Sequence, residues 1–125
     1  MYKLFPIAYK HAADLSGTTE PAVGGLCKIL ADGRIEALSG ASAAAFYAVY
    51  HGKRLDDGKH VALSGIVASF NAEAGNEPSV GDTVYIVDEN TISTSDGAGT
   101  RPALGKCIGV ASDGTYFVYV KGLLE

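Results

Sequence analysis

The fold is decided by a stretch in the last third of the chain, Leu104-Gly105-Lys106-Cys107-Ile108-Gly109-Val110-Ala111-Ser112-Asp113-Gly114-Thr115-Tyr116-Phe117-Val118-Tyr119-Val120. Both halves of this stretch are rich in β-branched and aromatic residues, which favour strands. The Asp113-Gly114 pair between them suits a type I′ turn, because that turn needs positive φ at its central residues and its twist matches the strands it joins. The stretch therefore predicts a hairpin in which Cys107–Ala111 pairs antiparallel with Tyr116–Val120.

The same alternation of short β-rich segments and turns extends back through the chain. Asp-Gly pairs occur at four places, and each predicts a tight reversal. Leu26–Leu30 and Ile35–Leu38 flank one of them, and the placing of Lys28 and Glu36 among apolar neighbours predicts a hairpin with one solvent-exposed face. Further strands are expected over Thr83–Val87, over the second half of Ala43–Tyr50, and as one long strand over His60–Phe70 that bends at Gly65.

These elements predict an all-β protein with little helix, folded as a compact antiparallel β-barrel or sandwich. Residues 1–25 show no sustained hydrophobic period, and we expect an extended N-terminal arm there, followed by a single β domain over 26–125. A short helix over Ala8–Leu15 is an alternative for part of the arm, although Ser16-Gly17-Thr18-Thr19 would end it early.

Composition narrows the range of partners. The chain has 125 residues, of which 47% are hydrophobic and 19% charged, a balance typical of an ordered domain. The net charge of −4 provides no general attraction to phosphate backbones, and the basic cluster Lys53-Arg54 with Lys59-His60 is interrupted by Asp56-Asp57, so no nucleic-acid partner is expected. The longest apolar run, Ala43–Tyr50, is too short to cross a bilayer, and no secretory leader is recognisable, so we expect neither a membrane partner nor export.

No motif in the sequence predicts catalysis or a cofactor. Gly99–Cys107 resembles a phosphate-binding loop, but the spacing of its glycines, the cysteine at its end and the strand that follows do not fit one. Ser42 lies in a segment one residue short of a nucleophile elbow, a motif that works in a much larger parallel sheet. Asp88-Glu89-Asn90 resembles the start of a calcium loop, but Ile92 occupies a ligand position.

The histidines and cysteines show no metal-binding spacing. His11, His51 and His60 form no His-x-x-x-His pair, and His51 and His60 flank a charged turn where surface positions are expected. Cys27 and Cys107 both lie in apolar strand-like runs, which favours two buried core residues over a disulfide, because a bridge would need an oxidising compartment and adjacent strands. We expect no metal, no cofactor and no catalytic residue.

Four segments of the second half of the chain resemble the small capsid decoration proteins of tailed bacteriophages, also called cement or head-stabilising proteins. The segments are Val61-Ala62-Leu63-Ser64-Gly65-Ile66-Val67, Pro78-Ser79-Val80-Gly81-Asp82-Thr83-Val84-Tyr85, Leu104-Gly105-Lys106-Cys107-Ile108-Gly109-Val110-Ala111 and Val118-Tyr119-Val120-Lys121-Gly122. The resemblance implies a non-enzymatic β-rich protein of the virion that is made in the host cytoplasm. It also implies a homotrimer that binds the major capsid protein on the outside of an assembled phage head.

Two sets of apolar residues are expected to make these contacts. Tyr2, Leu4, Phe5 and Ile7 of the arm are candidates for binding the capsid, because an extended segment can add as a strand to the edge of a partner sheet. The alternative is that the arm pairs with its own domain as a first strand, or with a neighbouring subunit. Leu123 and Leu124 are candidates for an oligomer interface. The competing interpretation is a β-barrel module that binds a small molecule or carbohydrate, with Tyr47, Tyr85 or Tyr116 as its platform, and an enzyme is the third.

Overall fold

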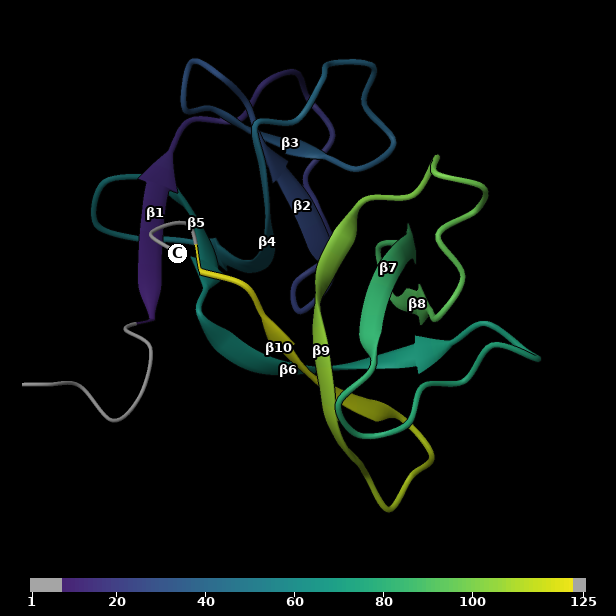
Figure 1. Cartoon of the computed structure of the whole chain (residues 1–125). Helices are drawn as coiled ribbons and strands as arrows, with labels where there is room; N and C mark the ends of the chain where they lie inside the picture. The colour runs from purple at the N-terminus through teal and green to yellow at the C-terminus, as the bar shows by residue number, and fades with distance from the viewer. Residues whose placement is uncertain (1–7, 123–125) are drawn as a thin grey trace, which may run out of the picture. The chain divides into compact units, whose positions relative to one another are not determined.

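The computed structural model describes residues 8–122, and these contain ten strands and no helix (Figure 1). The strands are β1 (Tyr9–Ala13), β2 (Leu26–Ile29), β3 (Ile35–Ala37), β4 (Phe46–Lys53), β5 (His60–Ser64), β6 (Ile66–Ala72), β7 (Thr83–Asp88), β8 (Thr91–Ser93), β9 (Ala103–Val110) and β10 (Tyr116–Val120). They form a five-stranded sheet and a closed five-stranded barrel, so the predicted all-β class is confirmed.

The chain divides into two compact units. The first runs to Ile66 and takes up the chain again from Lys121, and the second comprises Val67–Val120. The sheet with order β1-β5-β4-β2-β3 belongs to the first unit, and the barrel with order β10-β6-β8-β7-β9 belongs to the second.

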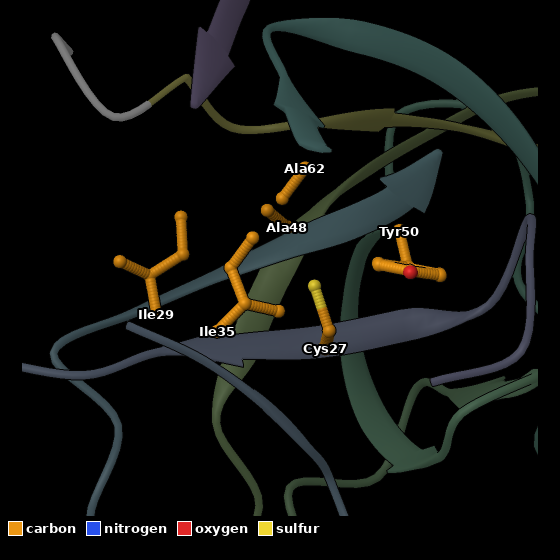
Figure 2. Packing of buried hydrophobic residues seen from close by; sticks show 6 residues of the cluster. All are labelled: Cys27, Ile29, Ile35, Ala48, Tyr50 and Ala62. Atoms are coloured by element: carbon orange, nitrogen blue, oxygen red, sulfur yellow. The ribbon is translucent and has the colours of Figure 1, made fainter. Parts of the chain in front are cut away.

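The sheet of the first unit is antiparallel throughout and rolls until its two edges meet. Just after β1, Leu15 bridges Ile35 of β3 in parallel fashion, and Ser16 N–H donates to the Ile35 carbonyl. The inner side of the rolled sheet holds a buried cluster of Cys27, Ile29, Ile35, Ala48, Tyr50 and Ala62, with Ala13 and Leu15 packed against it (Figure 2). Burial of these side chains is the main source of stability for this unit.

Strand β1 lies within residues 1–25, the range that the sequence analysis set apart as an arm. Tyr9–Ala13 pairs in register with Ser64–His60 of β5, so this part of the segment is a strand of the first unit. The alternative of a helix over Ala8–Leu15 was wrong. Along β1, half-buried and exposed residues alternate with the period of two that is typical of a strand. The half-buried residues are Tyr9, His11 and Ala13.

The second unit contains the hairpin from which the sequence analysis began. β9 and β10 pair antiparallel with Val110 opposite Tyr116, as predicted, and a bulge at Ile108 shifts the register between Phe117 and Val118. β7 pairs antiparallel with both β8 and β9, whereas β8 runs parallel to β6. The barrel interior is filled by apolar side chains, among them Phe70, Val84, Ile86, Ile92, Leu104, Cys107, Val118 and Val120.

One predicted strand is two strands. The segment His60–Phe70 was expected to be continuous with a bend at Gly65, but β5 ends at Ser64 and β6 begins at Ile66. Gly65 has a φ of 67°, in the left-handed region that side chains with a Cβ avoid. The glycine therefore breaks the strand completely, and the chain passes there from the sheet of the first unit to the barrel of the second.

Candidate functional site

A buried ion pair joins the first hairpin. Lys28 of β2 lies directly opposite Glu36 of β3, and its Nζ is 3.3 Å from Glu36 Oε1. Both residues are buried, so the expectation of a solvent-exposed face on this hairpin was wrong. A buried ion pair is stable only where further hydrogen bonds satisfy the remaining donors and acceptors of its two charged groups. In this hairpin, the loop after β3 provides those hydrogen bonds.

The loop after β3 wraps around this pair. Lys28 Nζ donates to the carbonyl oxygens of Gly40 and Ser42, and the Ser42 N–H donates to Glu36 at 3.1 Å. Hydrogen bonding from the hydroxyl and from the backbone N–H of Ser42 holds the pKa of Glu36 below its usual range. Ser42, considered above as a nucleophile, thus contributes its hydroxyl and its backbone to a structural network.

A second network links Glu20, Tyr50 and His60. Tyr50 Oη donates to Glu20 Oε1 at 2.7 Å and lies 2.7 Å from His60 Nδ1. Because the single proton of the phenol goes to the carboxylate, the Nδ1–H of His60 must be the donor to Tyr50. Burial and the neighbouring Glu20 carboxylate raise the pKa of Tyr50, which keeps the phenol protonated. His60 is buried, contrary to the expected surface position, whereas His51 is exposed as predicted.

A third network centres on Glu73 in the second unit. Its carboxylate accepts hydrogen bonds from the Arg101 guanidinium at 2.8 and 3.1 Å, from Asn76 Nδ2 at 2.8 Å and from Ser93 Oγ at 2.9 Å. These donors, Arg101 foremost, lower the pKa of Glu73 to about 2. Arg101 also donates to the Ser95 carbonyl, so the network fixes the loop between β8 and β9.

Two cations of the basic cluster around the β4–β5 turn, Arg54 and Lys59, form ion pairs within the chain. Arg54 forms a bidentate pair with Asp57, and Lys59 Nζ contacts Asp14 at 2.9 Å. The N–H of Gly58 donates to the carbonyl of Arg54, which closes the turn. Leu55 lies between Arg54 and Asp57 in the sequence, and its large apolar side chain is fully exposed on this turn.

Both cysteines are free thiols, and both are buried as predicted. Burial raises the pKa of Cys27 to about 12, so its thiolate, the reactive form, is scarce at neutral pH. Within residues 8–122 no group of three or more His, Cys, Asp or Glu side chains is arranged to hold a metal ion. No helix in the same part of the chain has the length and apolar character needed to span a membrane.

Large apolar side chains are exposed near the turn end of the β9–β10 hairpin. Ile108, Val110 and Phe117 are 48%, 59% and 39% exposed. Val110 lies opposite Tyr116 and Phe117 lies opposite Gly109, so these two side chains point to opposite faces of the hairpin. Val80 is also exposed, at 69%, and the N–H of the following Gly81 donates to the Cys107 carbonyl at 2.8 Å.

Of the candidate binding and interface residues chosen from the sequence, the structure describes only the three tyrosines. Tyr2, Leu4, Phe5 and Ile7 of the arm, and the interface candidates Leu123 and Leu124, lie outside the described residues. The platform tyrosines Tyr47, Tyr85 and Tyr116 are each half-buried, the first in one unit and the other two in the second.

The exposed apolar side chains of the β9–β10 hairpin were missed, although a signal for them existed in the sequence. From Cys107 to Ala111 every residue is apolar or glycine, and such a run in an antiparallel strand leaves apolar side chains on both faces.

The chain was also compared with known proteins. No protein-family model, no curated protein and no solved structure matches it.

Proposed function

We propose that this protein is a non-enzymatic capsid decoration protein, which binds the major capsid protein on the outside of a tailed-phage head and stabilises the shell as a homotrimer. The observation that supports it best is the exposure of large apolar side chains on a firmly held β scaffold, among them Leu55 on the β4–β5 turn and Ile108, Val110 and Phe117 of the β9–β10 hairpin. Such side chains favour contacts between proteins, and a decoration protein needs two kinds, one with its own copies and one with the shell.

The polar networks support the same proposal through their roles. The ammonium of Lys28 holds the carbonyl groups of Gly40 and Ser42, and the carboxylate of Glu73 holds the side chains of Arg101, Asn76 and Ser93. Each charged group is thus engaged in fixing a loop. Loops held in one conformation present a preformed surface, which lowers the entropy cost of docking on a repetitive shell.

The shell contact is assigned to the N-terminal arm. Tyr2, Leu4, Phe5 and Ile7 supply apolar side chains, and in the proposal the arm adds as a strand to the edge of a capsid-protein sheet, where main-chain hydrogen bonds supply affinity. Leu55 is the second candidate, since one apolar side chain projecting from a fixed turn can occupy a pocket in a partner.

The experiment is co-sedimentation with expanded, undecorated heads of tailed phages, followed by electron microscopy of the pellets. The full chain should pellet with at least one type of head and appear as added density on its outer surface. Deleting residues 1–7 should abolish pelleting while the melting temperature changes little, and Leu55→Ser should weaken it. Val23→Ser is the matched control, because Val23 is also an exposed apolar residue of the first unit.

The outcomes separate the parts of the proposal. Absence of binding to every head tested would contradict the decoration function, and specific retention on a glycan array would favour the binding-module alternative. Full binding by the truncated chain would reassign the shell contact to another surface. Unfolding of the truncated chain would instead place the arm among the structural elements.

A further inference from the structure

Asp-Gly pairs occur in four loops between strands, and each is a place where the main chain can rearrange. They are Asp32-Gly33, Asp57-Gly58, Asp96-Gly97 and Asp113-Gly114. In every pair the aspartate is exposed and the glycine has a positive φ, between 63° and 90°. Because glycine has no Cβ, its peptide nitrogen is accessible to the carboxyl group of the preceding aspartate. The four pairs share this chemistry, so a difference in reactivity between them comes from their surroundings.

Three of the four carboxylates are held by the same local contact. Oδ1 of Asp32, of Asp57 and of Asp113 accepts the backbone N–H of the second residue that follows, at 3.0 Å in each case. Each of these carboxylates also accepts a hydrogen bond from a neighbouring side chain, and the donors are Arg34, Arg54 and Thr115 respectively. These hydrogen bonds lower the pKa of all three carboxyl groups.

Asp96 lacks these contacts. Among the residues that the structure describes, none donates a hydrogen bond to its carboxylate or forms an ion pair with it. The N–H of Gly97 donates to Ser95 Oγ at 3.2 Å, whereas the other three glycines donate to main-chain carbonyls at 2.9 to 3.1 Å. The N–H of Arg101 donates to the Asp96 carbonyl at 2.9 Å, and this hydrogen bond must open for the main chain to rotate. The carboxyl group itself is free only at Asp96.

We propose that Asp96-Gly97 is a site of spontaneous main-chain modification, at which the aspartate converts to isoaspartate through a cyclic imide. The Gly97 nitrogen bonds to Cγ of the protonated Asp96 carboxyl group, and the proton of the nitrogen leaves with the hydroxyl of the carboxyl as water. A water molecule then adds to one of the two ring carbonyls and breaks its bond to the nitrogen. Attack at Cγ restores aspartate, whereas attack at the main-chain carbonyl leaves Gly97 joined through the side chain. Solvent is the only co-reactant, and nothing is oxidised or reduced.

The hydrogen bonds at the other three pairs slow this reaction in two ways. They hold the carboxylate away from the glycine nitrogen, and they favour the ionised carboxylate, which has no hydroxyl to lose as water.

The product would change the loop between β8 and β9. Isoaspartate adds Cβ to the main chain and moves the carbonyl that accepts the Arg101 N–H. The side chain of Arg101 holds Glu73, so the modification acts on the network that fixes this loop. This inference is independent of the proposed function, because it concerns the chain alone.

The test follows the uptake of heavy oxygen from water by the full chain. Every passage through the imide adds one solvent oxygen to the aspartate. The folded chain is kept for weeks in heavy-oxygen water at about pH 5, where part of an ordinary carboxyl group is protonated, and is then digested in ordinary water. Trypsin places the four pairs in different peptides, which mass spectrometry reads separately: Ile29–Arg34, Leu55–Lys59, His60–Lys106 and Cys107–Lys121.

The folded chain should gain label at Asp96 about tenfold faster than at the other three aspartates, a factor of the size that the loss of one hydrogen bond to a charged group produces. Isoaspartate should accumulate at the same residue, recognised in peptide fragments and by resistance to a protease that cleaves before aspartate. Asp96→Glu keeps the charge but closes a larger ring slowly, and it should remove the label from His60–Lys106. Asp113→Glu is the matched control and should leave that label unchanged.

The same measurement in guanidinium chloride separates the folded contacts from the local sequence. All four pairs should take up label in the unfolded chain, and the ratio of the folded rate to the unfolded rate should be highest at Asp96. Equal ratios at the four pairs would overturn the inference, as would a higher ratio at any of the other three. Label in His60–Lys106 that persists in Asp96→Glu would also overturn it, because another residue would then be its source.

Discussion

Lys28 and Glu36 stand directly opposite each other on β2 and β3 and form an ion pair of 3.3 Å, although both residues are buried. The pair is enclosed by the loop that follows β3, whose carbonyl groups at Gly40 and Ser42 accept the remaining protons of the ammonium. The charge therefore orders a loop as well as a hairpin. Gly40 is needed for this arrangement, because a Cβ at that position would collide with the Glu36 carboxylate.

Removing one partner of this pair should cost more than removing both. Lys28→Met leaves the Glu36 carboxylate buried without its counterion and should lower the melting temperature by several degrees. The double variant Lys28→Met, Glu36→Leu should recover most of that loss, because an apolar pair needs no compensation. Thermal unfolding followed by circular dichroism measures both. A double variant less stable than Lys28→Met would contradict this account.

Tyr50→Phe should destabilise the first unit by about 1–2 kcal/mol, because the buried Nδ1–H of His60 loses its acceptor and Glu20 loses a donor. Urea unfolding gives the value. Tyr47→Phe, three residues away on the same strand and half-buried, is the control and should change stability by less than about 0.5 kcal/mol. Equal effects of the two substitutions would show that the hydrogen bonds of Tyr50 contribute nothing specific.

Glu73 should make stability depend on pH below about 5. Its pKa falls from an ordinary value of 4.5 to about 2 in the folded chain, so the folded state binds fewer protons than the unfolded state in this window. The carboxylate's contribution is complete above the unfolded pKa and is lost as pH falls towards 2. The difference in urea midpoint between wild type and Glu73→Gln should accordingly be largest above pH 5 and shrink towards pH 2.

The control for this pH series is Glu77→Gln, which removes an exposed carboxylate near Glu73 in the sequence. Its midpoint should follow the wild type within error at every pH. A Glu73→Gln difference that stayed constant from pH 7 to pH 2 would mean that the ionised carboxylate is not what holds Arg101.

Gly65→Ala should destabilise the protein by about 1–2 kcal/mol, because a φ of 67° forces a Cβ towards the following carbonyl. Gly109→Ala is the control: Gly109 lies in β9 without a positive φ, and an added Cβ would meet Phe117 at an ordinary contact distance of 3.7 Å. That variant should be neutral or slightly stabilising by thermal unfolding. Equal losses in both variants would argue against backbone strain as the cause.

The strands and turns were determined locally. The β-branched segments on either side of Asp113-Gly114 fold as the hairpin that their side chains and turn geometry favour, and the alternation of Tyr9, His11 and Ala13 is visible in the sequence once a strand is considered. The segment Thr91–Ser93 escaped prediction because three residues are too few to show a period, and its parallel pairing with β6 depends on the closure of the barrel.

Burial and partnership were decided only by the tertiary structure. Periodicity places Lys28 and Glu36 on one face of a hairpin, but whether that face meets water depends on chain far away in the sequence, and here both faces are buried. The same holds for His60, which lies beside a charged turn yet packs on Tyr50. A sequence carries the local preferences of the backbone, whereas the polar networks arise where segments distant in sequence come into contact.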